Sequence, residues 1–218
     1  MAKKIYLSPS DQTSNKYAYG GHNEETICEK IADACEAALK RCGFDVKNNK
    51  TSSMADRVKE SDKWGADLHV PIHTNAYNNK VTGTRMFSWD TSGAGYKACK
   101  AIFDVLAPMT PGTSENIRAN KTLYEIRKPK APSAYIEVDF HDVYSVAKWL
   151  VEHTAEIGET IARGICNYYG VKYEAPQPAA KVLYKVQVGA YGEKANAESM
   201  MAKLEKAGFK GIIVEVKQ

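Results

Sequence analysis

The 218-residue sequence predicts an α/β fold, in which a mostly parallel, twisted sheet has helices on both faces and a small C-terminal β-α-β module follows. Two observations support this prediction. Short runs rich in β-branched and aromatic residues alternate with longer segments in which apolar residues recur at helical spacing. Residues 174–180 (EAPQPAA) follow neither pattern and contain two prolines, which is typical of a linker. The chain therefore divides into a domain at 1–173, a linker at 174–180 and a module at 181–218.

Strands and helices alternate through the first half of the larger domain. Strands are expected at 3–8, 44–47 and 67–73, and helices at 24–42 and 54–64. Gly43 follows the first helix at the position of a C-terminal cap. Because Pro71 cannot donate a ladder hydrogen bond, it indicates a place near the end of the third strand or an irregular pairing there.

The second half continues this alternation and leads into the module. Strands are expected at 84–89, 122–126 and 133–140, and helices at 93–106 and 143–169. Residues 107–121 are polar and proline-rich, which is typical of a loop. In the module, strands at 184–191 and 211–216 flank a helix at 195–207 and form one β-α-β unit.

Charge and hydropathy exclude some classes of function. The formal net charge of +4 is spread without a basic run, and the sequence has no glycine-rich phosphate loop, so we expect no nucleic acid partner. Apolar runs stay below the ~18 residues that a membrane span requires, so we expect no membrane insertion. The start, MAKKIYLSPSD, has too short an apolar run for a signal peptide, which predicts a cytoplasmic location on synthesis.

The five cysteines predict reduced thiols instead of disulfides or a metal cluster. An odd number cannot pair completely within one chain, and no CxxC pair is present. Cys28, Cys35 and Cys42 recur every seven residues along one side of the first expected helix. We therefore expect them to be small core residues.

Several side chains at expected strand and helix ends could bind a metal. His73 ends the third strand, and Glu137 lies within the apolar strand at 133–140. His22 and Glu24 flank the start of the first helix. Chemistry in open α/β sheets gathers beyond the carboxyl ends of strands, and a carboxylate in an apolar strand requires a partner, a metal or a raised pKa. Two carboxylates and a histidine at one sheet edge suggest a mononuclear zinc site with a nearby base.

Each of these residues also has an ordinary structural explanation. Glu24 alone is a helix-start charge favoured by the macrodipole, and His73 alone is a partly exposed hydrogen-bonding histidine. His69 lies four residues before His73, about 13 Å away in a strand, so we do not expect it to share a metal. His141 could approach the same rim, whereas His153 on the last helix is expected at the surface.

Several ordered motifs resemble those of one known family. IYLSPS, NEE, WGADLHVPIHTNA, RKPKAP and YIEVDF, spread over residues 3–172, are similar to motifs of the zinc-dependent N-acetylmuramoyl-L-alanine amidases of the amidase-3 type, in particular the phage endolysin and clostridial autolysin subgroup. The resemblance implies a peptidoglycan hydrolase that cleaves the amide bond between N-acetylmuramic acid and the L-alanine of the stem peptide. It also implies Zn²⁺ as the cofactor.

The resemblance assigns roles to individual residues. Glu24 in HNEE matches a ligand glutamate, His73 in IHTN matches a ligand histidine, and Glu137 in YIEVDF matches the glutamate that acts as acid and base. Arg57 and Asn75 fall on recurring family positions at which structural support is the expected role.

One family motif is missing, because SPSDQ replaces the Gly-His pair that usually follows the first strand. We expect His22, in a glycine-bearing loop two residues before Glu24, to supply the third ligand. Asp11, at the vacant place, is the alternative, and His141 is a weaker one. The expected metal set is therefore His22, Glu24 and His73. The alternative function is that of a degenerate, non-catalytic protein that binds cell wall.

The C-terminal module, YKVQVGAYGEKANAESMMAKLEKAGFKGIIVEV, resembles half of a SPOR-type wall-binding domain. Bacterial peptidoglycan is thus the expected partner of both domains. One helix on two strands leaves an apolar face that so small a module rarely shields, so we expect two modules to pair in a homodimer. Docking of the module onto the amidase domain is the alternative. We expect the protein to act on the wall after release, as a phage lysin or as a host enzyme freed when a mother cell lyses.

Overall fold

The computed structural model describes residues 2–51, 53–177 and 184–216. The chain forms two compact units, Met1–Pro176 and Gln177–Gln218. Residues 178–180 of the expected linker and 181–183 of the expected module lie outside the described residues.

The N-terminal unit is built on a six-stranded sheet with the strand order β2-β1-β3-β6-β4-β5. Its strands are β1 (Lys4–Pro9), β2 (Asp45–Asn48), β3 (Leu68–Asn75), β4 (Arg85–Ser88), β5 (Asn116–Ala119) and β6 (Tyr135–Phe140). All neighbouring strands are parallel except β4 and β6, which run antiparallel. The predicted α/β fold with a mostly parallel sheet is confirmed.

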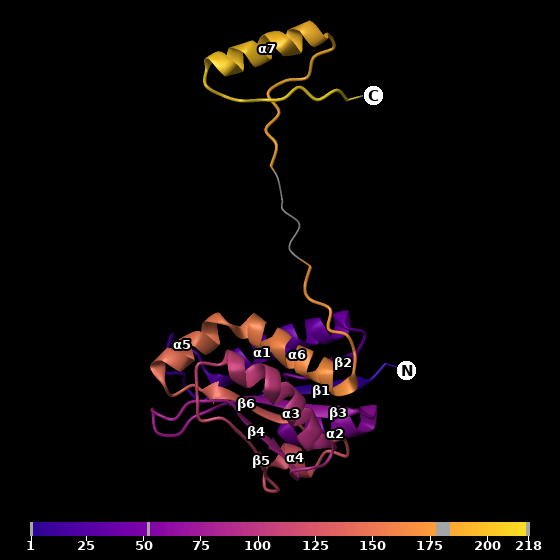
Figure 1. The fold of residues 1–218 in the computed structure, drawn as a ribbon, viewed down its shortest axis with the longest axis vertical. Helices are drawn as coiled ribbons and strands as arrows, with labels where there is room; N and C mark the ends of the chain where they lie inside the picture. The colour runs from indigo at the N-terminus through magenta and orange to yellow at the C-terminus, as the bar shows by residue number, and fades with distance from the viewer. Residues whose placement is uncertain (1, 52, 178–183, 217–218) are drawn as a thin grey trace. The chain divides into compact units, whose positions relative to one another are not determined.

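Helices cover both faces of this sheet. They are α1 (Glu24–Arg41), α2 (Met54–Trp64), α3 (Ala94–Leu106), α4 (Tyr124–Arg127), α5 (Tyr144–Glu152) and α6 (Thr154–Tyr169), with a 3-10 turn, η1 (Ala107–Met109), after α3. α6 packs against both α1 and α3 on one side of the sheet, whereas α2 contacts α4 and β1 on the other (Figure 1).

The two faces of the sheet differ in polarity because successive strand residues point to opposite sides. The side chains that form the core with α1, α3 and α6 are apolar: Ile5, Leu7, Val70, Ile72, Ile136 and Val138. The alternate positions on the central strands are mostly polar or aromatic: Tyr6, Ser8, His69, His73 and Glu137. The face toward α2 and α4 therefore carries the side chains that can do chemistry.

The cysteine prediction is confirmed for Cys28 and Cys35 and only in part for Cys42. Cys28 and Cys35 are fully buried on α1, Cys42 is half-buried just after it, and the cysteines are free thiols.

Two glycines of α6 allow close helix packing. A Cβ at Gly158 would lie 2.5 Å from the carbonyl oxygen of Ile31 on α1. A Cβ at Gly164 would lie 2.5 Å from the Cα of Ile102 on α3. Both distances are far below van der Waals contact. The helices can therefore pack this closely only because glycine has no Cβ at these two positions.

The strand predicted at 122–126 is wrong, because this segment forms a turn followed by α4. The side-chain oxygen of Asn120 accepts hydrogen bonds from the backbone N–H groups of Thr122 at 2.9 Å and Leu123 at 3.2 Å. Such local side-chain bonds favour a turn over an extended ladder.

Two further boundaries differ from the prediction. The segment 107–121, expected to be a loop, contains η1 and β5, and β5 pairs in parallel with β4. The helix expected at 143–169 is two helices that meet at His153, whose backbone has φ −118° and ψ 20°. The His153 ring supports the break, since its Nδ1 lies 2.8 Å from the carbonyl oxygen of Trp149.

Pro71 lies in the middle of β3, which is an interior strand, instead of near the strand end. The predicted irregular pairing is present later in the same strand, where the register between β3 and β6 shifts between His73 and Asn75.

The C-terminal unit contains the expected helix, α7 (Lys194–Lys206). The strands expected at 184–191 and 211–216 are not formed among the described residues. Apolar and polar residues alternate along these segments, as they do in strands. The apolar side chains are exposed: Tyr184, Val186, Val188, Ile212, Val214 and Val216.

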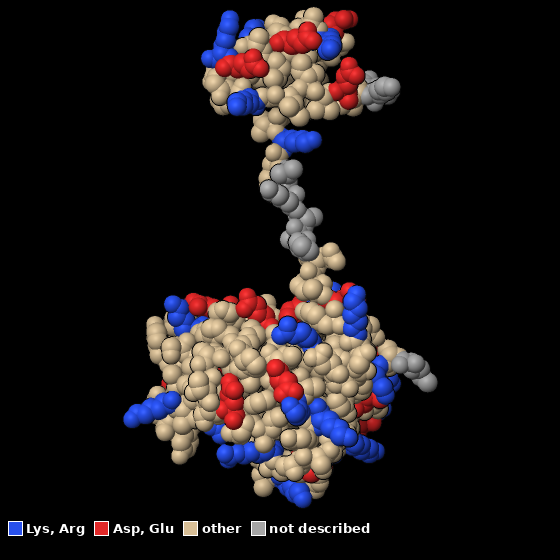
Figure 2. All heavy atoms as spheres, in the orientation of Figure 1, with Lys and Arg blue, Asp and Glu red and all other residues tan. Residues whose placement is uncertain are grey.

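Charges of both signs are mixed on the face of the molecule that Figure 2 shows. On the face drawn in Figure 2, Lys and Arg side chains intermingle with Asp and Glu side chains, in keeping with the small net charge of +4. In the part of the chain that the structure describes, no helix has both the length and the apolarity needed to cross a bilayer.

Candidate active site

His73 and Glu24 meet where β3 passes the start of α1. His73 Nδ1 lies 2.8 Å from Glu24 Oε1, and both side chains are buried. Glu24 is the first residue of α1, and the preceding Asn23 caps this helix by accepting a hydrogen bond from the Thr26 N–H at 2.9 Å. Asn15 Nδ2 donates to the second oxygen of Glu24 at 2.7 Å. The helix cap and the loop before it thus hold the carboxylate against the imidazole.

His73 stands between two carboxylates. Its Nε2 lies 3.9 Å from Glu125 Oε2, and its ring stacks on Tyr135 with 4.7 Å between centroids. Burial lowers the pKa of His73, but the nearby Glu125 carboxylate, the hydrogen bond to Glu24 and the charge of Glu137 outweigh burial and raise this pKa to about 10. Without a bound metal, the imidazole is therefore protonated at neutral pH.

Glu125, on the short helix α4, is a site residue that sequence reasoning missed. Its Oε1 lies 3.1 Å from His69 Nε2 and accepts a hydrogen bond from Ser8 Oγ. Burial raises the pKa of Glu125, but the hydrogen bond with His69 and the nearby His73 imidazole outweigh burial and lower this pKa to about 2. The ionised carboxylate thus connects α4 to β1 and β3. The available signal in the sequence is an acidic residue inside the apolar run LYEI.

Glu137 lies beside His73 on the neighbouring strand. The two are register partners in the β3–β6 ladder, so their side chains leave the same face of the sheet from strands about 4.8 Å apart. Glu137 Oε2 is buried and has no hydrogen-bond partner among the described residues. Burial raises the pKa of Glu137, the charge of His73 lowers it and that of Glu24 raises it, with a result of about 8. A carboxyl group of this kind can both donate and accept a proton near neutral pH.

The position of this pair differs from the expectation in one respect. His73 and Glu137 lie within their strands, on the polar face of the sheet, and not beyond the strand ends. The open side of the site is therefore a sheet face near the carboxyl end of β3.

His22 is not in contact with the other two expected ligands among the described residues. Its ring packs over Gly20, where an added Cβ would lie 2.8 Å from the imidazole Cδ2. In the described part of the chain the ring makes no hydrogen bond or ion pair. The backbone carbonyl of His22 accepts a hydrogen bond from the Tyr17 N–H at 2.9 Å, which fixes the loop and leaves the ring unengaged.

The two alternative ligands are engaged elsewhere. Asp11 forms an ion pair with Arg57 at 3.6 Å, and its side chain is 40% exposed. His141 Nδ1 lies 2.9 Å from Thr74 Oγ1. Because Thr74 and His73 are adjacent in β3, their side chains point to opposite faces of the sheet.

Two of the side chains that meet at this site could serve as ligands of one zinc ion. Imidazole nitrogen and carboxylate oxygen are ordinary zinc ligands, and His73 Nδ1 and Glu24 Oε1 face each other across 2.8 Å. Gln12 approaches the same point, with its Nε2 3.4 Å from His73 Nδ1. In the described residues, no three His, Cys, Asp or Glu side chains form a complete ligand group. The unpartnered oxygen of Glu137 fits a proton carrier beside the two donors.

Comparisons with known proteins match two parts of the chain to two families. The profile of the family described as N-acetylmuramoyl-L-alanine amidase matches residues 5–167, and that of the SPOR domain matches residues 177–218. The chain is 27% identical over 218 residues to the sporulation-specific N-acetylmuramoyl-L-alanine amidase of Bacillus subtilis (strain 168), covering 97% of this chain and 84% of the relative. It is 27% identical over 167 residues to the amidase CwlM of Bacillus licheniformis, covering 77% of this chain and 64% of that relative.

Solved structures share the fold of the N-terminal unit. The catalytic domain of CwlV, an N-acetylmuramoyl-L-alanine amidase from Bacillus (Paenibacillus) polymyxa var. colistinus, superposes with a TM-score of 0.70 at 21% identity, covering 78% of this chain and 99% of that one. The CwlD amidase of Clostridioides difficile, solved with the GerS lipoprotein, gives 0.67 at 19% identity, covering 77% and 98%. At this level of identity the likeness concerns the fold.

Proposed function

We propose that this chain, which belongs to the N-acetylmuramoyl-L-alanine amidase family, is a peptidoglycan hydrolase. It would cleave the amide bond between N-acetylmuramic acid and the L-alanine of the stem peptide. The observation that carries the proposal is the group formed by Glu24, His73 and Glu137. Two potential metal ligands lie there beside the half-buried carboxyl group of Glu137, whose pKa is raised. This arrangement suits the two requirements of amide hydrolysis, a place for a Lewis acid and a group that moves protons.

Glu24 and His73 are the residues that would hold zinc, and His22 is our proposed third ligand. His22 lies two residues before Glu24, and its ring has no competing hydrogen bond among the described residues. Gly20 and Gly21 before it have φ of 71° and 70°, a conformation that other residues rarely adopt and that a loop bending toward the site can use. Zinc bound there would polarise the scissile carbonyl and activate a water molecule.

Glu137 is the proposed proton carrier. Its Oε2 lies buried on the same sheet face as the His73 ring and has no protein partner among the described residues. As a carboxylate it accepts a proton from the attacking water, and as a carboxylic acid it delivers a proton to the leaving nitrogen of L-alanine. A pKa of about 8 suits both roles near neutral pH.

The Glu137→Gln variant tests this assignment. The substitution keeps the shape of the side chain and removes the titrating group, so the release of new amino groups from purified peptidoglycan should fall by about 10²- to 10⁴-fold. Zinc content and melting temperature should stay at the wild-type values. Glu156→Gln, at an exposed position of α6, is the matched control and should keep full activity. Hydrolysis by Glu137→Gln at a near wild-type rate would refute the role of Glu137.

A second candidate is a non-catalytic protein that binds cell wall through both units. The incomplete ligand group among the described residues is the observation that favours it. Zinc content separates the two functions: an amidase should bind about one zinc ion per chain and lose affinity in His22→Ala. A non-catalytic protein would bind no zinc, sediment with peptidoglycan and release no amino groups from it.

The match to the SPOR domain supports peptidoglycan as the partner of the C-terminal unit. We propose in addition that two copies of this unit pair, because its alternating apolar side chains are exposed, with Val186 at 89% and Val216 at 80%.

A further inference from the structure

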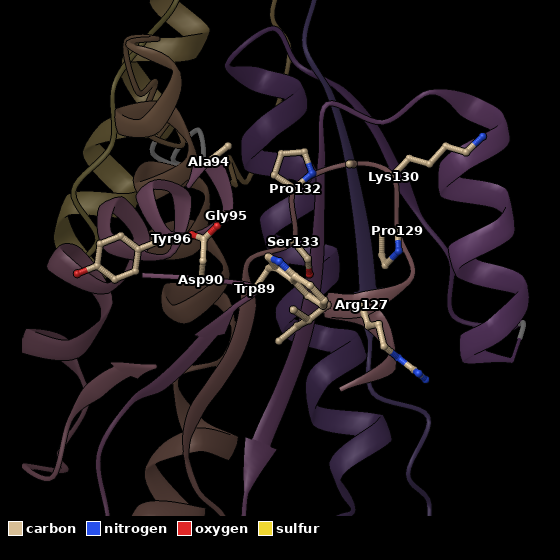
Figure 3. A pocket seen from close by; sticks show the side chains of 12 residues that line it. Trp89, Asp90, Ala94, Gly95, Tyr96, Arg127, Pro129, Lys130, Pro132 and Ser133 are labelled. Carbon is tan, nitrogen blue, oxygen red and sulfur yellow. The ribbon is translucent and has the colours of Figure 1, made fainter. Parts of the chain in front are cut away.

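A pocket of about 290 Å³ lies in the N-terminal unit, between the end of β4, the start of α3 and the segment 127–133 (Figure 3). Trp89, Asp90, Arg127 and Ser133 are among the residues that line it. None of these residues takes part in the chemistry described above.

The pocket lies close to the active site along the same sheet face. Helix α4 joins the two, because Glu125 contacts His73 while the next residues, Ile126 and Arg127, line the pocket. Ser133 precedes Glu137 by four residues of nearly continuous strand, a separation of about 13 Å. An extended peptide whose cleaved bond lies at the active site would reach this distance within roughly four residues.

The start of α3 gives the pocket an anion-binding wall. Ala94, Gly95 and Tyr96, the first three residues of the helix, line the pocket. The Asp90 carboxylate accepts a hydrogen bond from the Gly93 N–H just before the helix, but among the described residues no side chain accepts from the N–H groups of Ala94, Gly95 and Tyr96, and the first turn contains no acidic residue. The first N–H groups of a helix have no intrahelical partner and attract carboxylates.

Ser133 is a second, independent feature that points to a ligand. The residue is 5% exposed, lines the pocket, and its hydroxyl has no hydrogen-bond partner among the described residues. Leaving a buried hydroxyl unpaired costs free energy that a bound polar group would recover. Gly95 keeps the helix start against this residue, because a Cβ there would lie 2.6 Å from the Ser133 carbonyl oxygen.

Charged groups of both signs stand at the rim. Arg127 is exposed, and in the described part of the chain its guanidinium makes no ion pair. The Asp90 carboxylate accepts hydrogen bonds from the Ser92 and Gly93 N–H groups, and these bonds together with the charge of Lys121 lower its pKa. Trp89 is 46% exposed and provides an apolar wall. A ligand that carries a carboxylate, an amino group and an aliphatic chain would match this set.

We propose that this pocket is a subsite for the diamino acid of the peptidoglycan stem, with its carboxylate at Arg127, Ser133 and the start of α3 and its amino group at Asp90. The proposal rests on the function proposed above, since it places the stem peptide on the far side of the cleaved bond from the glycan. The pocket would then help to determine which wall chemotype the protein accepts.

The test is calorimetric titration of the full chain with the free tripeptide L-Ala-γ-D-Glu-diaminopimelate, whose binding requires no cleavage. Arg127→Ala should weaken binding by about tenfold or more, because a charge-assisted contact is lost. Lys128→Ala, a neighbouring cation that does not line the pocket, is the matched control and should bind like the wild type. Wild-type protein should bind less tightly to a tripeptide with norleucine at the third position and to one with amidated carboxylates.

Equal affinity of Arg127→Ala and Lys128→Ala would overturn the proposal, as would equal affinity of the wild type for the native and the norleucine tripeptide. Failure of the wild type to bind the native tripeptide would overturn it too. These outcomes are distinct from failure of the proposed function, since hydrolysis that depends on Glu137 and binding of the free tripeptide are measured separately.

Discussion

At the scale of single residues, the protonation of His73 has the most direct consequence. The neighbouring carboxylates of Glu24 and Glu125 hold its pKa at about 10, so the proton on the ring must leave before Nδ1 can bind a metal. Zinc affinity should therefore rise about tenfold per pH unit between about pH 6 and about pH 8. Calorimetry in buffers of different ionisation enthalpy should show release of at least one proton per zinc ion bound.

Glu125→Gln provides a contrast for this measurement. Loss of the Glu125 charge removes one of the groups that raise the pKa of His73, so zinc should displace the proton more easily at low pH. The pH dependence of zinc affinity should then become shallower. Zinc binding to the wild type without proton release would contradict a protonated His73.

The same residues show how far the sequence predicts the site. Glu24, His73 and Glu137 could be named because each lies at an element boundary or in an apolar strand. A charged group in an apolar strand requires a partner, a metal or a raised pKa. Glu125 and Gln12 could not be named, because their roles depend on a turn and a loop that bring them to His73 from distant parts of the chain. The third metal ligand stays a prediction for the same reason.

At the scale of elements, packing and helix propensity predict opposite effects of a glycine-to-alanine substitution in α6 on the free energy of unfolding. Alanine is favoured over glycine within a helix by about 1 kcal/mol, yet a Cβ at Gly158 would lie 2.5 Å from the Ile31 carbonyl oxygen. We therefore expect Gly158→Ala to lower the free energy of unfolding by about 1–3 kcal/mol, measured by denaturant titration. Arg163→Ala, an exposed position on the same helix, should change it by less than about 0.5 kcal/mol. A more stable Gly158→Ala would show that the helices separate freely.

Helix α4 should contribute to stability in a way that depends on pH. The pKa of Glu125 is about 2 in the folded protein against 4.5 as its ordinary value, so its contribution is complete above about pH 4.5 and is lost as the pH falls toward about 2. Glu125→Gln should lower the free energy of unfolding at neutral pH by on the order of 3 kcal/mol. The difference from the wild type should shrink over that acidic range. A difference that stays constant down to about pH 2 would contradict a lowered pKa.

The elements that sequence reasoning found and those it missed differ in the origin of their structure. β1, β3, β6 and α1 follow from apolar patterns long enough to specify them. α4 and β5 do not: α4 follows a turn made by the side chain of Asn120, and β5 is a polar strand that pairs along β4. The break at His153 also depends on a single backbone conformation inside an otherwise periodic helix.

At the scale of the whole molecule, the C-terminal unit carries the remaining prediction. Tyr184, Val186 and Val188 alternate with polar residues, as do Val214 and Val216 around Glu215, and these apolar side chains are exposed. About 40 residues rarely bury enough apolar surface to be stable alone, whereas unpaired strand-like segments readily add to a sheet. A second copy offers the same two segments, so pairing around a two-fold axis would cover both sets at once.

Sedimentation of the full chain at micromolar concentration should therefore give twice the monomer mass. Val214→Asp places a charge in the apolar row and should shift the protein to the monomer, whereas Glu215→Gln, on the alternate side of the same segment, should leave the dimer intact. Hydrolysis of a small soluble substrate should be equal in all three proteins, because the residues of the proposed active site all lie within the N-terminal unit. A wild type that sediments as a monomer would show that these side chains are covered in another way, for example by the amidase unit of the same chain, and would refute pairing.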